Sequence, residues 1–209
     1  MKKFKTKDQI KIAAQLLFAE RGIDGVSVRE IVKAAGQKNM ASLHYYFHSK
    51  EELARELLMD AGKLIEDQRT LLLDALEAEG GPATPTEILE IFIKCAVISN
   101  DDPRALSNVR LFVMAVQKSP SLVLETIGDT ETSAYFRCLA HLRAFMTDFD
   151  EDVRERRLAL LQQFVFSTLS SRERALSEQN HEVALWEGDE MLNELVISSW
   201  GLLFANPVL

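Results

Sequence analysis

The sequence contains little cysteine, glycine or proline. Of 209 residues, two are cysteine, nine are glycine and five are proline. Cys95 and Cys138 lie far apart in the chain and lack the spacing of a metal-ligand pair, so we expect neither a disulfide framework nor a zinc site. No glycine-rich phosphate-binding loop is present either. These absences argue against several common classes of enzyme and metalloprotein.

Long apolar runs are also absent. No segment approaches the roughly 20 apolar residues that a membrane-spanning helix requires. The basic N-terminus, MKKFKTKDQIK, lacks the apolar stretch of a signal peptide. Hydrophobic residues make up 47% and charged residues 27%, as is usual for a soluble folded protein. We therefore expect a soluble, cytoplasmic protein with no membrane partner.

Strand-like alternation bounded by turn residues does not occur, so the chain is predicted to be all-α. Hydroxyl residues followed three positions later by Glu or Gln predict helix starts at Thr6, Ser27, Ser49 and Thr84. A Gly-Gly-Pro segment near residue 80 marks a break. Apolar periodicity and these signals predict helices over about 6–21, 27–35, 39–46, 49–79, 85–99, 103–117, 120–147, 151–175 and 189–205.

Charge is distributed unevenly along the chain. The net charge is −8. Residues 1–50 contain ten Lys or Arg and four Asp or Glu, which gives this part a net charge of 10 − 4 = +6. The remainder carries 24 − 10 = 14 basic and 32 − 4 = 28 acidic residues, which gives it a net charge of −14. This asymmetry is typical of a small polyanion-binding domain joined to an acidic body.

The basic region has the pattern of a helix-turn-helix. Two short predicted helices, 27–35 and 39–46, are joined by a turn that contains Gly36 and follow a longer helix. The second short helix of such a motif enters the major groove of DNA. Lys38 and Lys50 could neutralise phosphates, and the free N–H groups at Ser27 and Ser49 could bind them. The predicted DNA-contacting residues are Lys5, Thr6, Ser27, Val28, Arg29, Lys38, Asn39, Met40, Ser42, His44, Tyr45, Tyr46 and Lys50.

Three stretches of the first 55 residues resemble the DNA-binding domain of the TetR family of bacterial transcriptional regulators. They are IAAQLLFAERG (12–22), VSVREIVKAAG (26–36) and YYFHSKEEL (45–53). The resemblance implies two domains: a helix-turn-helix DNA-binding domain over residues 1–50, and a helical ligand-binding and dimerisation domain over residues 51–209.

The resemblance also implies a homodimer that binds a near-palindromic DNA operator, acts as a repressor and is released by a small-molecule effector. The apolar faces of helices 151–175 and 189–205 independently favour a two-fold partner surface. The expected dimer-interface residues are Val153, Leu161, Val165, Leu169, Leu195, Ser199 and Leu202. The expected ligand-binding residues, which combine aromatic, sulfur-containing and polar side chains, are Phe92, Cys95, Asn108, Arg110, Phe112, Met114, Gln117, Tyr135, Cys138 and His141.

Two other classes of protein were weighed against a DNA-binding regulator. An enzyme is disfavoured, because no catalytic constellation is present and no cofactor is implied. His44 and His48 are four residues apart, as in some metal sites, but the HExxH pattern is absent and the helix is expected to end near Phe47. We therefore predict no metal. The alternative function is a helical protein-interaction module with a basic head and no DNA target.

Overall fold

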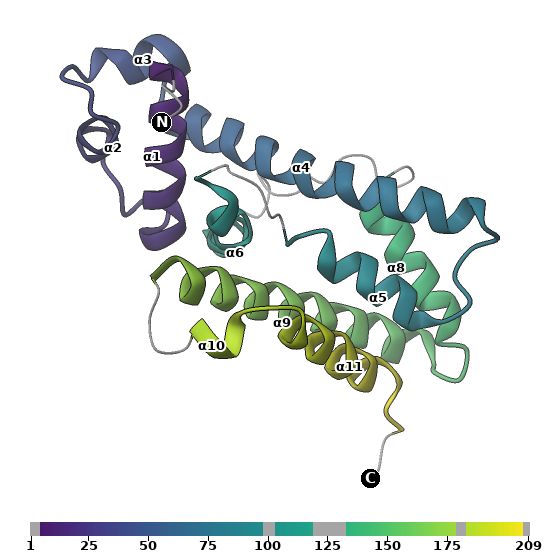
Figure 1. The fold of residues 1–209 in the computed structure, drawn as a ribbon. Coiled ribbons are helices and arrows are strands. Elements are labelled where there is room, and N and C mark those ends of the chain that lie inside the picture. The colour runs from purple at the N-terminus through teal and green to yellow at the C-terminus, as the bar shows by residue number, and fades with distance from the viewer. Residues whose placement is uncertain (1–4, 98–102, 119–132, 179–182, 207–209) are drawn as a thin grey trace. The chain divides into compact units, whose positions relative to one another are not determined.

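The computed structural model of the chain describes residues 5–97, 103–118, 133–178 and 183–206 (Figure 1). Within these ranges every regular element is a helix and no strand occurs, which confirms the predicted all-α class. The helices are α1 (Thr6–Arg21), α2 (Val28–Ala34), α3 (Ala41–Phe47), α4 (Lys50–Ala78), α5 (Pro85–Lys94), the 3₁₀ helix η1 (Ala105–Ser107), α6 (Asn108–Lys118), α8 (Ala134–Phe145), α9 (Glu151–Glu178), α10 (Val183–Trp186) and α11 (Glu190–Phe204).

The predicted helix bounds differ from the observed ones mainly in the middle of the chain. Helix α5 ends at Lys94, five residues before the predicted end, and the segment predicted as one helix over 103–117 is divided into η1 and α6. Of the predicted helix 120–147, only the part that forms α8 lies among the described residues. The short helix α10 was not predicted.

Two of the predicted helix starts show which hydroxyl residues act as caps. The Ser27 side chain accepts a hydrogen bond from the backbone N–H of Glu30, and the Glu30 carboxylate accepts one from the Ser27 N–H, so this capping box is confirmed. Helix α1 begins at Thr6 as predicted, but Thr6 does not cap it, because it is already the first helical residue. The cap position is occupied by Lys5, whose side chain makes no capping hydrogen bond.

The chain divides into two compact units. Unit 1 comprises the described parts of residues 1–63 and 99–126, and unit 2 those of residues 64–98 and 127–209. The boundary predicted after residue 50 coincides with the start of α4, whereas the units meet inside that helix, between Lys63 and Leu64.

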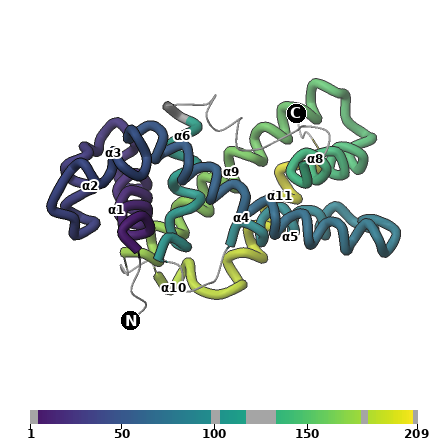
Figure 2. The backbone as a smooth tube through the Cα atoms, turned by 90° about the horizontal axis from the view of Figure 1, so that it is seen from above, coloured from purple at the N-terminus to yellow at the C-terminus, as the bar shows by residue number. Residues whose placement is uncertain are grey.

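Unit 1 is built around α1, which packs against both α2 and α6. Figures 1 and 2 show α1, α2 and α3 gathered into one group. Fully buried side chains from each of these three helices, Ile10, Phe18, Ile31 and Leu43, form its core. Burial of this apolar surface is the main contribution to the stability of such a small helical unit.

Unit 2 is a group of packed helices in which α5 contacts α8 and α11, and α9 contacts α8, α10 and α11. Its core contains Leu73, Phe92, Leu142, Leu161 and Leu203, each almost completely buried. None of the described helices is both long enough and apolar enough to cross a membrane.

Candidate nucleic-acid interface

Helix α3 is held in place by two buried residues and exposes the rest of its surface. Leu43 is completely buried and Phe47 is 3% exposed, whereas Tyr45 is 79% exposed. Helix α3 begins at Ala41, and the Ala41 N–H donates a hydrogen bond to the Asn39 side-chain oxygen at 2.9 Å. Apolar residues at positions 43 and 47 thus fix the helix, and the neighbouring positions are free to contact a ligand.

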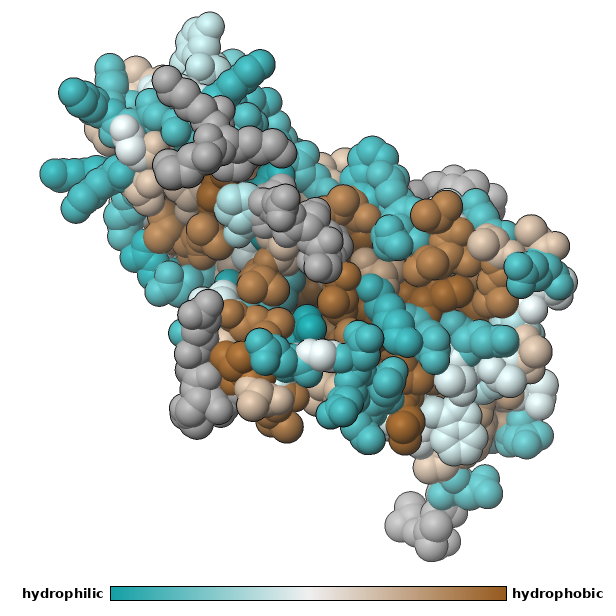
Figure 3. Space-filling model, in the orientation of Figure 1, coloured by the Kyte–Doolittle hydropathy of each residue, from teal (hydrophilic) through white to brown (hydrophobic). Residues whose placement is uncertain are grey.

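The exposed face of α3 combines aromatic rings with a flexible side chain and a cation. Tyr45 and Tyr46 contact each other edge to face, with ring centroids 4.9 Å apart. Met40 and Lys38 are exposed just before the helix, and among the described residues Lys38 has no ion-pair partner. Hydrophilic side chains project from this part of the surface in Figure 3. Such a face can contact base edges and phosphates in the major groove.

The remaining predicted contact residues vary in exposure. Lys5, Arg29, Asn39 and His44 are exposed, and Thr6, Val28 and Ser42 are partly exposed. The Ser42 hydroxyl donates a hydrogen bond to the Asn39 carbonyl at 2.6 Å, and His44 Nδ1 lies 2.8 Å from the His48 carbonyl. Helix α3 ends at Phe47 as expected. Among the residues that the structure describes, no group of three or more His, Cys, Asp or Glu is arranged to hold a metal ion.

Three predicted phosphate-binding groups are already engaged within the protein. The Ser27 N–H donates to the Glu30 carboxylate at 2.9 Å, and the Ser49 N–H donates to the Phe47 carbonyl at 2.7 Å. The structure therefore contradicts the expectation that these two amides are free. Lys50 is partly buried, and its ammonium donates to the carbonyls of Ile23 and Val26 at 2.9 and 3.1 Å. Lys50 thus closes the turn between α1 and α2.

An exposed ion pair reinforces the start of α2. Hydrogen bonds from the Ser27 hydroxyl and backbone N–H, together with Arg21, lower the pKa of Glu30 to about 2. Arg21 Nη1 lies 2.8 Å from the Glu30 carboxylate. A carboxylate at the first turn of a helix also interacts favourably with the helix dipole. The ionised Glu30 therefore links Arg21, the last residue of α1, to the start of α2.

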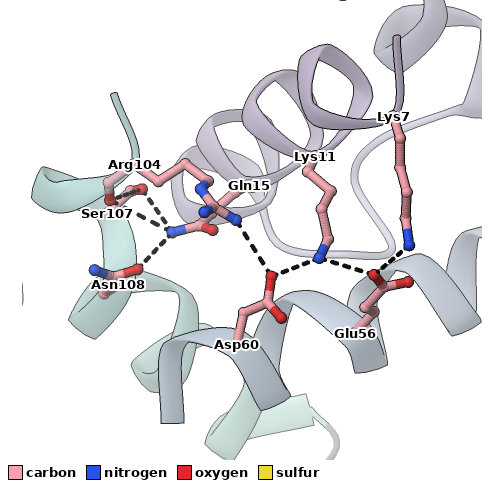
Figure 4. Close-up of polar contacts among 8 residues, drawn as sticks. All are labelled: Lys7, Lys11, Gln15, Glu56, Asp60, Arg104, Ser107 and Asn108. Carbon is pink, nitrogen blue, oxygen red and sulfur yellow. Dashed lines mark hydrogen bonds and ion pairs between the residues drawn. The ribbon is translucent and has the colours of Figure 1, made fainter. Parts of the chain in front are cut away.

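A second set of charges joins α1 to α4 within unit 1 (Figure 4). The Lys7 and Lys11 ammonium groups each lie 2.8 Å from the Glu56 carboxylate, and Lys11 lies 2.5 Å from Asp60. The Arg104 guanidinium reaches the same Asp60 oxygen at 3.4 Å. Burial alone would raise the pKa of Glu56, but the two lysines outweigh this effect and lower the pKa below its ordinary value. Positive and negative groups therefore alternate along this contact.

A buried amide connects α1 with η1 and α6. Gln15 is 1% exposed, and its Nε2 donates to Ser107 Oγ at 3.0 Å and to Asn108 Oδ1 at 2.8 Å (Figure 4). Ser107 and Asn108 are themselves buried. This contact was not predicted from the sequence. The signal that could have revealed it is the position of a polar Gln15 beside Ala13 and Ala14, on the apolar side of α1.

The predicted ligand-binding residues are divided between the two units. Asn108, Arg110, Phe112 and Met114 belong to unit 1, and the side chain of Gln117 lies outside the described residues. Asn108 takes part in the Gln15 contact, and Arg110 donates to the Leu106 carbonyl at 2.9 Å. Unit 2 contains the remaining five, which are Phe92, Cys95, Tyr135, Cys138 and His141.

Four of these five residues of unit 2 lie around an arginine that the sequence analysis did not single out. Arg69 of α4 is 4% exposed, and its guanidinium lies 5.6 Å from the ring centroid of Phe92 and 5.3 Å from that of Tyr135. It interacts electrostatically with Cys95 and Cys138. His141, in contrast, is paired with Glu77 at 2.7 Å. We call Glu66, Arg69, Phe92, Cys95, Tyr135 and Cys138 the Arg69 cluster.

Most of the predicted dimer-interface residues are buried within unit 2. Leu161, Val165, Leu169, Leu195 and Ser199 are at most 2% exposed, while Val153 and Leu202 are partly exposed. Other apolar residues of the same two helices are exposed instead: Leu160 at 58%, Ile197 at 62% and Trp200 at 47%. Hydrophobic side chains reach the surface over α9, α10 and α11 in Figure 3.

The fold and the exposed α3 define a helix-turn-helix protein. Residues 10–57 match the family model described as "Bacterial regulatory proteins, tetR family". Over these residues the N-terminal segment of the chain is similar to TetR-family regulators, which confirms the resemblance predicted from the sequence.

Two relatives match parts of the chain. The chain is 24% identical over 110 residues to the "Uncharacterized HTH-type transcriptional regulator YxaF" of Bacillus subtilis (strain 168), covering 53% of this chain and 54% of that one. It is 43% identical over 58 residues to the "Probable HTH-type transcriptional regulator YttP" of the same organism, covering 28% of each chain. The matches thus span about half of YxaF and less of YttP. Both relatives are named as regulators, in agreement with the prediction that the chain is not an enzyme.

A solved structure extends the similarity to the whole fold. A protein from Rhodococcus sp. RHA1 has a TM-score of 0.50 at 20% identity, covering 95% of each chain. At this level of identity the similarity concerns the fold alone.

Proposed function

We propose that the protein is a TetR-type transcriptional regulator that binds a near-palindromic DNA operator as a homodimer and represses transcription until a small molecule releases it. The observation that carries this proposal is the exposure of Tyr45 on a helix anchored by Leu43 and Phe47. Tyr45 lies in the N-terminal part of the chain, whose excess of basic residues favours a polyanionic partner such as DNA.

We assign DNA contact to exposed residues of the head, by which we mean residues 5–50, with helices α1, α2 and α3 and the turns between them. Lys38, Met40, Tyr45 and Tyr46 face outward at the start and along the outer side of α3. We assign base-edge and sugar contacts to these residues, with Lys5 and Arg29 neutralising phosphates. Two such helices in a two-fold dimer would read half-sites about 34–36 Å apart, one helical turn of DNA.

Homodimerisation is supported by the exposed apolar residues of α9 and α11. Leu160, Ile197 and Trp200 leave a hydrophobic surface on helices whose opposite faces already form the core of unit 2. A two-fold contact that covers such a surface is the commonest way for soluble proteins to bury it. The same symmetry would generate the inverted repeat in the operator.

The test is the selection of bound duplexes from a random DNA pool by the purified full-length protein. The expected result is an enriched inverted repeat that the Tyr45→Ala variant binds weakly. Leu71→Ala is the matched control, because it also removes an exposed apolar side chain, 66% exposed, but from the part of α4 that belongs to unit 2. This control should select the same repeat as the wild type. A folded protein that enriches no sequence would overturn the proposal and would favour binding of the basic head to a protein partner.

A further inference from the structure

The buried Arg69 guanidinium is not fully satisfied by its surroundings. Its Nη1 donates to the Glu66 carboxylate at 2.5 Å, but its Nε is buried and has no hydrogen-bond partner among the described residues. A guanidinium presents its N–H groups as a planar fork that matches a carboxylate in two parallel hydrogen bonds. One side of this fork therefore has a donor available for an anionic acceptor.

Apart from Glu66, no member of the Arg69 cluster offers Arg69 an anionic acceptor. The Cys95 thiol donates to the Phe92 carbonyl at 3.4 Å. Burial raises the pKa values of both Cys95 and Cys138, and it outweighs the opposite effect of Arg69, which includes a hydrogen bond to Cys95. Both thiols therefore stay neutral and are weak acceptors. Burial likewise raises the pKa of Tyr135 to about 12, and its hydroxyl donates to Gln162. Glu66 supplies the one carboxylate of the cluster.

The two carboxylate oxygens of Glu66 have different partners. One oxygen pairs with Arg69, and the other accepts hydrogen bonds from the Ser133 hydroxyl at 2.7 Å and the Tyr135 N–H at 3.3 Å. The second set of hydrogen bonds connects α4 to the start of α8 and does not require Arg69. The Glu66 side chain is 23% exposed while that of Arg69 is 5% exposed, so the pair reaches solvent on the glutamate side.

We propose that Arg69 anchors the effector and that the effector is a small organic carboxylate with an apolar body. This inference rests on the proposed release by a small molecule. The effector's carboxylate forms hydrogen bonds with Arg69 in competition with Glu66, and its apolar body packs against the rings of Phe92 and Tyr135. A charge-assisted pair in such a dry environment is stronger than the same pair in water. The arginine thereby selects acids over neutral molecules of the same shape.

The test is isothermal titration calorimetry of the full-length protein with benzoate, phenylacetate and octanoate, each compared with its neutral amide. At least one acid should bind at submillimolar concentration, with its amide about tenfold weaker or worse. Arg69→Met should remove the acid's advantage, because methionine keeps much of the apolar stem without the charge. Arg156→Met, at an exposed arginine of α9, is the matched control and should bind as the wild type does.

Glu66→Gln separates competition from a merely structural role. Its amide oxygen can still accept from Ser133 and Tyr135, but it no longer offers a carboxylate to Arg69, so acids should bind about tenfold more tightly. Arg69→Lys should lose part of the acid affinity. If Arg69→Met fails to fold, the higher acid affinity of Glu66→Gln and the lower acid affinity of Arg69→Lys still test the proposal. Equal binding of acid and amide, no binding of any acid, or unchanged acid affinity in Glu66→Gln would each overturn the proposal.

DNA binding measured on the same samples distinguishes this inference from the proposed function. Acids that bind through Arg69 to a protein that selects no duplex would leave the anion site standing and refute the regulator. A protein that selects its inverted repeat but binds none of the acids would refute the anion site at Arg69 and leave the regulator standing. Acids that bind without releasing the duplex would refute effector control while retaining the site.

Discussion

At the residue scale, polar and aromatic side chains of the head differ in whether they bind other groups of the protein or point into solvent. Lys50 illustrates the first, since its ammonium is bound to two backbone carbonyls. Tyr45 illustrates the second, since four-fifths of its surface is in solvent. The distinction cannot be made from residue type, because both residues were predicted as DNA contacts on chemical grounds.

Tyr45→Ala and Phe47→Ala should differ in their effect on stability. Loss of the exposed Tyr45 ring should weaken operator binding while changing the melting temperature little, because exposed substitutions usually alter stability by less than about 0.5 kcal/mol. Loss of the buried Phe47 ring should cost about 3–5 kcal/mol and destabilise the head. Thermal melts followed by circular dichroism check the placement, and equal melting of the two variants would contradict it.

Glu30→Gln should make the stability of the head less dependent on pH. The pKa of Glu30 in the folded chain is lowered to about 2, whereas an unperturbed glutamate titrates near 4.5. The stabilising effect of the ionised group is therefore fully present above pH 4.5 and is lost as the pH falls toward 2. The wild type should melt at a higher temperature than Glu30→Gln at pH 7, and the difference should shrink between pH 4.5 and the acid limit of folding. A difference that stays constant over this range would refute the assignment.

At the scale of elements, the contact of α1 with η1 and α6 contains the buried amide of Gln15. Gln15→Leu would leave Asn108 Oδ1 without its donor and remove a hydrogen bond from Ser107, in a site closed to water. We expect a loss of about 1–3 kcal/mol in the free energy of unfolding, the usual result of leaving a buried polar group unpaired.

Urea denaturation measures this loss, with Gln163→Leu as the control because Gln163 is exposed on α9. The control should stay within about 0.5 kcal/mol of the wild type. If both variants were equally stable, the amide contact would not hold α1 against α6.

The helices and the head could be predicted from the sequence because their signals are local. The Ser27 capping box, the glycine at position 36 and the apolar pair Leu43 and Phe47 each act within a few residues. The contacts of Gln15 with Ser107 and Asn108 join residues about 90 positions apart, and no local pattern specifies such a pairing. Arg69 shows the same limit, although its place between Ile65 and Leu73, four residues from each, marks it as lying on the buried face of α4.

Most of the residues predicted for the dimer interface lie in the core of the protomer, for a related reason. Periodicity identifies the apolar positions of α9 and α11, but both the core of the protomer and its partner surface are apolar. Only packing reveals that Leu161 and Leu195 belong to the core, whereas Ile197 remains exposed. The choice of helices remains a prediction, now argued from different residues.

At the scale of the whole molecule, Ile197→Asp should convert the proposed dimer into a monomer. A charge introduced at an exposed residue does not disturb the core of unit 2, but it would be buried without a partner in a two-fold contact. Sedimentation equilibrium measures the change. Ala140→Asp, at an exposed position of α8, is the matched control and should remain dimeric. A dimer that survives Ile197→Asp would place the contact elsewhere.

The ion pairs of unit 1 have a consequence for how the protein displaces the counterions that surround DNA. Eight of the ten basic residues in positions 1–50 are described. Lys7, Lys11 and Arg21 are paired with carboxylates and Lys50 is bound to carbonyls, so 8 − 4 = 4 remain for phosphates: Lys5, Arg29, Lys33 and Lys38. Each neutralised phosphate contributes about 0.9 to the slope of log K against log salt concentration. The eight described basic residues should therefore contribute less to the salt dependence of operator binding than their number suggests, and a contribution from all eight would mean that these pairs open on DNA.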